Sequence, residues 1–165
     1  MTQDKPEMGH GLGAEMPQSG VRGFSPQALD DAMRRKGAGR DDLADAIGVS
    51  RQSVGSWVAG RSVPTPALLV SAARWLDLSP ADLAPIPADR LRIADLRVRA
   101  GLTQREAAEA LDVGSTTITE VERGRRQFKS ELGERMAEVY GVDYSIIDAA
   151  WKRTVTARQA RLDSL

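Results

Sequence analysis

The feature that most constrains the fold is a pattern of apolar residues that occurs twice in the chain. Residues 43–61 and residues 107–125 align without a gap, so that Arg61 recurs as Arg125, 64 positions later. The apolar positions agree between the two copies, whereas the polar residues between them differ. A repeat of this kind indicates that one fold is used twice with different surface chemistry.

Each copy has the spacing of a helix, a tight turn and a second helix. The second helix of such a pair crosses closely over the first, so the residues that flank the turn must be small or apolar. These residues are Ala44, Ile47, Val49, Val54 and Trp57 in the first copy and Ala108, Leu111, Val113, Ile118 and Val121 in the second. Because Trp57 aligns with Val121, we expect its indole in the core. We expect the same of Trp75 and Tyr140, whereas Trp151 fits a core cap and an oligomer contact equally well.

Helix-start and helix-stop signals divide the rest of the chain into two series of five helices. Ser25, Thr65 and Ser79 each precede a proline, which is typical of a capped helix start. The helices expected in the first unit are 26–36, 41–47 and 51–59, followed by two that begin near residues 66 and 80. In the second unit they are 89–100 and 115–123, with others that begin near residues 103, 130 and 145. Strand-like alternation is absent, so the fold class is all-α.

The domain organisation follows from this series. We expect a disordered leader over residues 1–23, a first domain over 24–84, a linker that contains prolines over 85–88 and a second domain over 89–150. Residues 151–165 form a basic tail that extends the last helix in one interpretation. The linker can span at most roughly 20 Å, so the two domains must lie side by side.

Composition excludes several classes of function. The chain has no cysteine, and its one histidine, His10, lies in the leader without a partner for metal binding or catalysis. We therefore predict neither an enzyme nor a cofactor or metal site. No apolar run approaches 20 residues and no secretory signal is visible, so we expect a cytoplasmic protein.

The segment from Ile93 to Arg125 resembles the Cro/C1-type (XRE family) DNA-binding domain, and the resemblance covers residues 89–148. Residues 24–84 are similar, with Arg40 where the family usually has the glutamine seen at Gln104, and without the acidic residue seen at Glu122. The resemblance implies two tandem five-helix, lambda-repressor-like domains, each with its third helix in the major groove of double-stranded DNA.

Carried over position by position, the resemblance assigns the side chains that contact DNA. Those that face bases are Arg51, Gln52, Ser53 and Ser56 in the first copy and Ser115, Thr116, Thr117 and Glu120 in the second. Those that face phosphates are Arg40, Arg61, Gln104, Arg123, Arg125, Arg126 and Lys129. Arg51 suits guanine and Gln52 suits adenine, whereas the second copy favours shape and phosphate contacts.

The predicted function is a bacterial or phage transcriptional regulator that binds specific DNA sequences, with repression as its activity and the nucleoid as its location. A homodimer and a small-molecule effector are left open. The alternative is an interaction module of the same fold, such as an antitoxin, an adaptor or a dimerisation unit, in which one or both copies do not bind DNA. Equal numbers of basic and acidic residues, 23 of each, and the acidic Glu120 favour this alternative.

Overall fold

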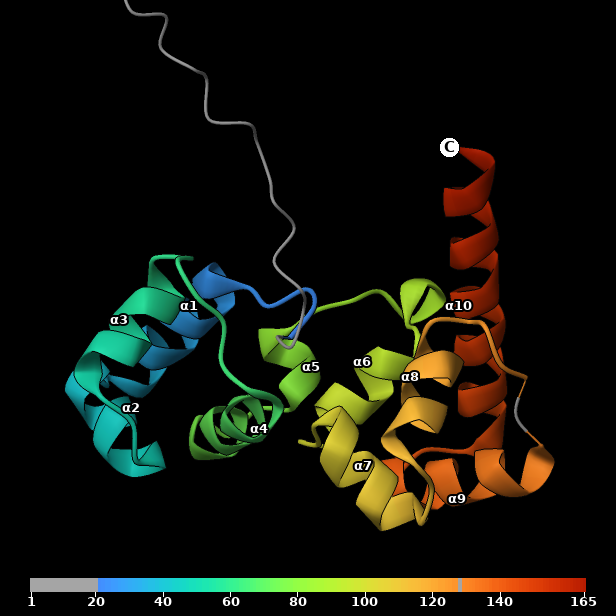
Figure 1. Ribbon diagram of the computed structural model, residues 1–165. Coiled ribbons are helices and arrows are strands. Elements are labelled where there is room, and N and C mark those ends of the chain that lie inside the picture. The colour runs from blue at the N-terminus through green and yellow to red at the C-terminus, as the bar shows by residue number, and fades with distance from the viewer. Residues whose placement is uncertain (1–20, 128) are drawn as a thin grey trace, which may run out of the picture.

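The computed structural model describes residues 21–127 and 129–165, and every regular element in these ranges is helical (Figure 1). The first unit contains α1 (Pro26–Lys36), α2 (Arg40–Ile47), α3 (Arg51–Val58), α4 (Pro66–Trp75) and α5 (Pro80–Leu83). A short 3₁₀ turn, η1 (Ala88–Arg90), leads to α6 (Ile93–Arg99), α7 (Gln104–Leu111), α8 (Ser115–Glu122), α9 (Ser130–Tyr140) and α10 (Tyr144–Asp163). The predicted all-α fold class is confirmed.

The helix starts follow the caps expected from the sequence, with one difference. The hydroxyl oxygens of Ser25 and Thr65 accept hydrogen bonds from backbone N–H groups three residues later, at the starts of α1 and α4. The helix predicted over 89–100 is instead divided into η1 and α6. The Asp95 carboxylate accepts a hydrogen bond of 2.8 Å from the backbone N–H of Arg92, which caps α6 and starts it there.

Each unit has its own hydrophobic core. Leu29, Leu43, Val54, Leu69 and Leu83 are fully buried in the first, and Ile93, Leu111, Ile118, Met136 and Ile147 in the second. Trp57 and Tyr140 are buried as predicted, and Trp75 is partly buried against the first core. Trp151 is partly buried against the second core, which agrees with the core-cap interpretation of this residue.

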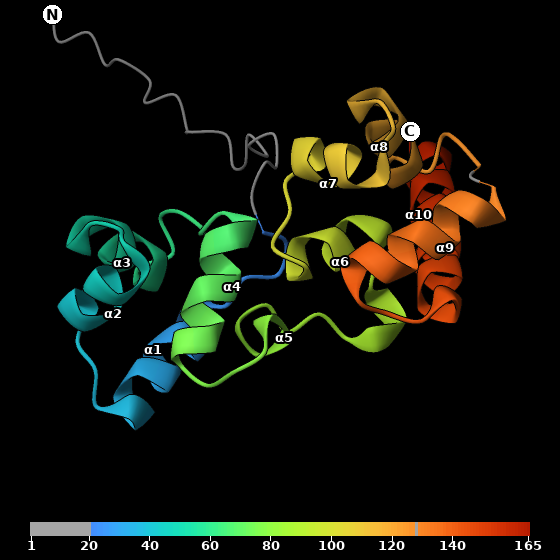
Figure 2. The ribbon, with the colours of Figure 1, turned by 90° about the horizontal axis from the view of Figure 1, so that it is seen from below.

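The two units pack directly against each other through α4 and α6 (Figure 2). Val98 of α6 is buried in the core of the first unit. At Gly101, just after the end of α6, a Cβ atom would lie 3.1 Å from a methyl carbon of Val70 on α4, and the φ angle of 78° also favours glycine. The side-by-side placement expected from the short linker is therefore seen in the structure.

The segment just before α1 contributes to this contact, contrary to its assignment to a disordered leader. Val21 is 2% exposed and belongs to the first core, and Arg22 forms an ion pair of 2.5 Å with Asp95 of α6. This hydrogen-bonded pairing raises the pKa of the Arg22 guanidinium. Sequence pattern could not show this, because Arg22 and Asp95 are 73 positions apart. The rest of the predicted leader, residues 1–20, lies outside the described residues.

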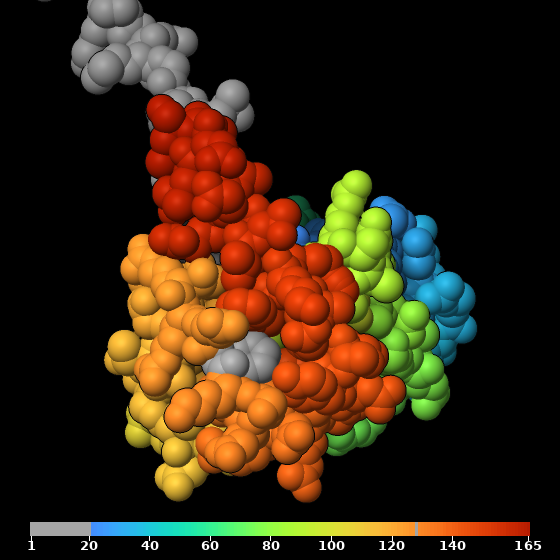
Figure 3. Space-filling view, turned by 90° about the vertical axis from the view of Figure 1, so that its right-hand side faces the viewer, coloured from blue at the N-terminus to red at the C-terminus, as the bar shows by residue number. Residues whose placement is uncertain are grey.

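Helix α10 begins at Tyr144 and is 20 residues long, so the tail predicted after residue 150 is helical as far as Asp163. Its last turns project beyond the second unit (Figures 1 and 3).

The turn between paired helices provides a test of the repeat. Gly48 after α2 and Asp112 after α7 occupy equivalent positions, and both have left-handed φ angles, 72° and 52°. Replacing Asp112 with glycine removes Cβ strain, so we expect the free energy of unfolding to rise by about 0.5–1 kcal/mol. The reciprocal change, Gly48→Asp, should lower it by a similar amount. Urea denaturation measures the free energy of unfolding of both variants. An Asp112→Gly protein that is less stable than the parent would contradict the proposed strain at Asp112.

Candidate nucleic-acid interface

The third helix of each unit, α3 or α8, has one buried face and one exposed face. Val54 and Trp57 bury α3 against its unit, and Ile118 and Val121 do the same for α8. The Ser50 hydroxyl caps α3 by accepting a hydrogen bond of 3.1 Å from the Ser53 N–H. Since the repeat fixes the buried face in both copies, the polar residues between these positions define the surface that a partner can reach.

In the first copy, Arg51 and Gln52 are exposed on the first turn of α3. The Arg51 Nε atom lies 3.3 Å from a carboxylate oxygen of Asp41 on α2, and both side chains are more than half exposed. Ser53 and Ser56 are partly exposed, and the Ser53 hydroxyl lies 3.0 Å from that of Ser50. All four side chains predicted to face bases therefore reach solvent, with Ser53 partly engaged in the cap.

The cations predicted to flank α3 lie at two different places. Arg40 begins α2, and its guanidinium lies across Gly55 of α3, where a Cβ atom would be 3.3 Å from Nη1. A residue larger than glycine at position 55 would crowd this guanidinium. Arg61 is exposed beyond the end of α3, next to Gly60 with its left-handed φ of 73°. The equivalents of Arg40 and Gly55 in the second copy are Gln104 and Thr119, whose side chains lie 3.5 Å apart.

In the second copy, two side chains predicted to face bases are already engaged by arginines predicted to face phosphates. Arg126 donates a hydrogen bond of 3.3 Å to the Thr117 hydroxyl, and Arg125 lies 3.7 Å from the Glu120 carboxylate. Ser115 and Thr116 are exposed without such contacts among the described residues. The negative charge of Glu120 is therefore partly compensated within the protein.

A buried ion pair that the sequence analysis did not assign connects the first helix of the second unit to α8. Arg97 of α6 donates hydrogen bonds of 2.5 and 3.3 Å to the Glu122 carboxylate and a third, of 2.7 Å, to the Leu102 carbonyl oxygen. The two side chains are 9% and 6% exposed. The only signal in the sequence was the presence of Glu122 in the second copy and its absence from the first.

Two further residues depend on this pair. Gln104 donates a hydrogen bond of 2.8 Å to the same Glu122 carboxylate, which fixes its side chain at the start of α7. The Tyr140 hydroxyl is buried nearby, and its burial raises the pKa far above the ordinary value, with the Glu122 charge as a second cause. Gln104 remains exposed, so its predicted role at a phosphate stays a prediction.

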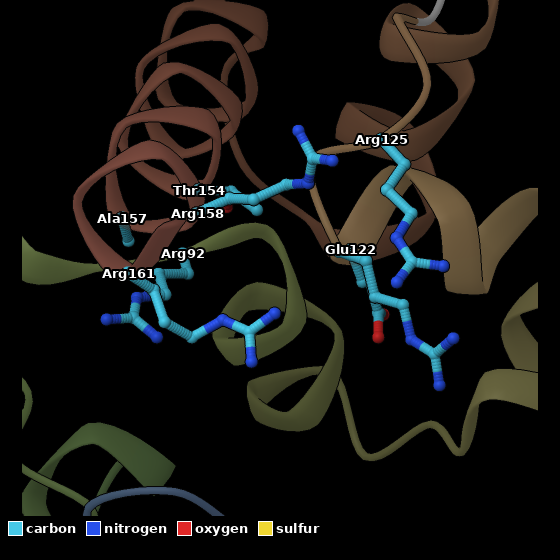
Figure 4. Close-up of a pocket in the computed structure, with 8 residues that line it drawn as sticks. Arg92, Glu122, Arg125, Thr154, Ala157, Arg158 and Arg161 are labelled. Carbon is cyan, nitrogen blue, oxygen red and sulfur yellow. The ribbon is translucent and has the colours of Figure 1, made fainter. Parts of the chain in front are cut away.

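The remaining predicted phosphate contacts, Arg123 and Lys129, are exposed beyond α8. Arg123 and Arg125 also line a cleft between the end of α8 and α10 (Figure 4). In the described part of the chain, no group of three or more His, Cys, Asp or Glu residues could hold a metal ion. Over the same residues, every helix is too short or too polar to cross a bilayer.

Comparisons with known proteins agree with this arrangement. One family model, described as a helix-turn-helix domain, matches residues 90–150, and another, described as helix-turn-helix, matches residues 33–83. The chain therefore carries helix-turn-helix domains at both positions of the repeat.

One curated relative is the cryptic phage CTXphi transcriptional repressor RstR of Vibrio cholerae. It is 41% identical over 51 residues, which are 31% of this chain and 46% of the repressor. The chain thus spans about half the length of the relative that it matches. No solved structure gives a significant match.

The first copy offers a test of the buried ion pair. The positions equivalent to Arg97 and Glu122 are Met33 and Val58, which are apolar. Breaking a buried pair leaves one charge uncompensated, so we expect Arg97→Met or Glu122→Val alone to lower the free energy of unfolding by about 3–5 kcal/mol. The double variant should recover most of this loss, as a urea double-mutant cycle would show. Losses that simply add would contradict this coupling.

Proposed function

We propose that the protein is a transcriptional repressor that binds specific double-stranded DNA sequences, with α3 and α8 in the major groove. The observation that carries this proposal is the shared arrangement of the two copies. Each presents exposed hydrogen-bonding side chains on the outer face of its third helix, and each has cationic or amide groups at the start of the preceding helix and beyond the end of the third. Side chains on such a helix can contact base edges while the flanking groups bind phosphates.

The first copy is the stronger candidate for base recognition. Arg51 is held by Asp41, but an exposed ion pair of this kind contributes only about 0–1 kcal/mol. A bidentate contact between an arginine and guanine contributes about 1–3 kcal/mol of discrimination. The balance favours release of Arg51 from Asp41 when guanine is in reach. Gln52 is exposed on the same turn of α3, where it can pair with adenine.

The second copy suits the DNA backbone better. Ser115 and Thr116 offer short hydroxyl groups, whereas Arg123, Arg125, Arg126 and Lys129 follow α8 directly. Linking a base-reading unit to a backbone-binding unit on one chain can raise the overall affinity by about 10²–10⁴, provided that both bind at once. Unlike helices on one chain imply an asymmetric operator, and a homodimer would imply a palindrome of two such composite sites.

A protein-interaction module remains the second candidate, because the chain carries no net charge and the acidic Glu120 is partly exposed on α8. The two functions differ in their dependence on salt, since DNA binding weakens steeply as salt rises. Selection of bound sequences from a random duplex pool tests the proposal directly. We expect an enriched, asymmetric site, and a pool without enrichment at low salt would contradict sequence-specific binding.

Two substitutions separate base recognition from phosphate binding. Arg51→Ala should cost about 1–3 kcal/mol at one base pair of the selected site and relax specificity there. Arg125→Ala should weaken binding to all sequences. It should also make the negative slope of log affinity against log salt shallower by about 1. Gel-shift titrations at several salt concentrations measure both quantities.

The control for both substitutions is Arg34→Ala on α1, whose side chain is exposed and paired with Asp30. It removes the same charge outside the assigned interface and should change neither quantity. Equal effects from all three substitutions would indicate a non-specific loss of charge and contradict the assignment of Arg51 to a base.

A further inference from the structure

A highly charged cleft lies between α8 and α10 in the second unit. It has a volume of about 510 Å³, and its lining includes Glu122 and five arginines, which are Arg92, Arg123, Arg125, Arg158 and Arg161. Figure 4 shows these side chains coming from the start of α6, the end of α8 and the last turns of α10. Segments far apart in the sequence thus contribute arginine side chains to the lining of one cleft.

Tight packing holds α10 against the end of α8. A Cβ atom at Gly124 would lie 3.2 Å from the Thr154 carbonyl oxygen and 3.2 Å from the Val155 Cα atom, so the two backbones approach closely. The Thr154 hydroxyl is buried and receives the backbone N–H of Ile93, and Arg153 donates to the Leu91 carbonyl oxygen. These contacts fix the position of α10 just before the turns that carry Arg158 and Arg161.

The positive charge of the cleft is not balanced by ion pairs among the described residues. Glu122 is its one carboxylate, and that group is 6% exposed and already bound by Arg97 and Gln104. Arg92, Arg123, Arg158 and Arg161 form no ion pair with any of the described residues, and Arg125 has only its 3.7 Å contact with Glu120. Like charges that a fold gathers in this way repel one another and attract an anion.

We propose that this cleft binds the phosphates of the DNA that α8 contacts, so that α10 is a second backbone-binding element of the interface. The inference rests on the proposed function and extends it to residues outside the repeated domain. Arg123 and Arg125, at the end of α8, form one wall of the cleft, so the surface is continuous with the predicted interface. Arg158 and Arg161 are three positions apart on α10, so they are neighbours on one face of the helix, and both line the cleft.

The test compares two exposed cations of α10 in the full chain. Arg161→Gln removes a charge from the cleft, whereas Lys152→Gln removes one from a side chain that is paired with Asp148 and does not line it. The probe is a labelled duplex of arbitrary sequence, roughly three helical turns long, titrated at several salt concentrations. We expect the magnitude of the slope of log affinity against log salt to decrease by about 0.9 for Arg161→Gln and by about 1.8 for the double variant of Arg158→Gln and Arg161→Gln. Lys152→Gln should leave this slope unchanged.

The outcomes distinguish this inference from the proposed function. If Arg125→Ala weakens duplex binding while the double variant binds like the parent, the proposed contact of α10 with DNA is wrong. The proposal that the protein binds DNA is then still supported. If the parent binds no duplex at low salt, both proposals are wrong. A parallel titration with tripolyphosphate tests whether the cleft binds a free phosphorylated anion instead of the phosphates of DNA. Tight binding that the double variant loses, with duplex affinity unchanged, would overturn the DNA assignment in favour of a small phosphorylated ligand.

Discussion

The buried pair of Arg97 and Glu122 is the interaction on which most of the second unit depends. It connects α6 to α8, and through the same carboxylate it fixes Gln104 at the start of α7. Because α6 also places Val98 in the first core, the orientation of α8 is tied to α4 of the other unit. The pair further removes the one carboxylate of the cleft from competition for the arginines around it.

The first unit has apolar side chains at the two positions that correspond to this buried ion pair. Met33 is buried where the second unit has Arg97, and Val58 stands where it has Glu122. Without a buried carboxylate, the residue at the start of α2 needs no such partner, and Arg40 lies over Gly55 instead. The duplicated scaffold thus carries two different arrangements of polar groups around the third helix.

Much of the fold could be predicted because its determinants are local. Caps at Ser25 and Thr65 and the apolar spacing around the turns depend on residues three or four positions apart. The packing of Val21 in the first core and the ion pair of Arg22 with Asp95 could not be predicted, since they depend on residues far apart in the sequence. For the candidate site, the exposed positions of α3 and α8 followed from the repeat, whereas the engagement of Glu120 and Thr117 by arginines and the cleft of α10 required three-dimensional placement.

The close contact between Gly101 and Val70 also bears on how DNA spacing would be read. For a protein that uses both units, one base pair inserted between the two contact sites shifts the second by about 3.4 Å and turns it by roughly 35° around the duplex. A flexible tether would absorb that change. Two units that share a core residue and pack closely at their junction would resist it, so the molecule would discriminate operators by phase as well as by sequence.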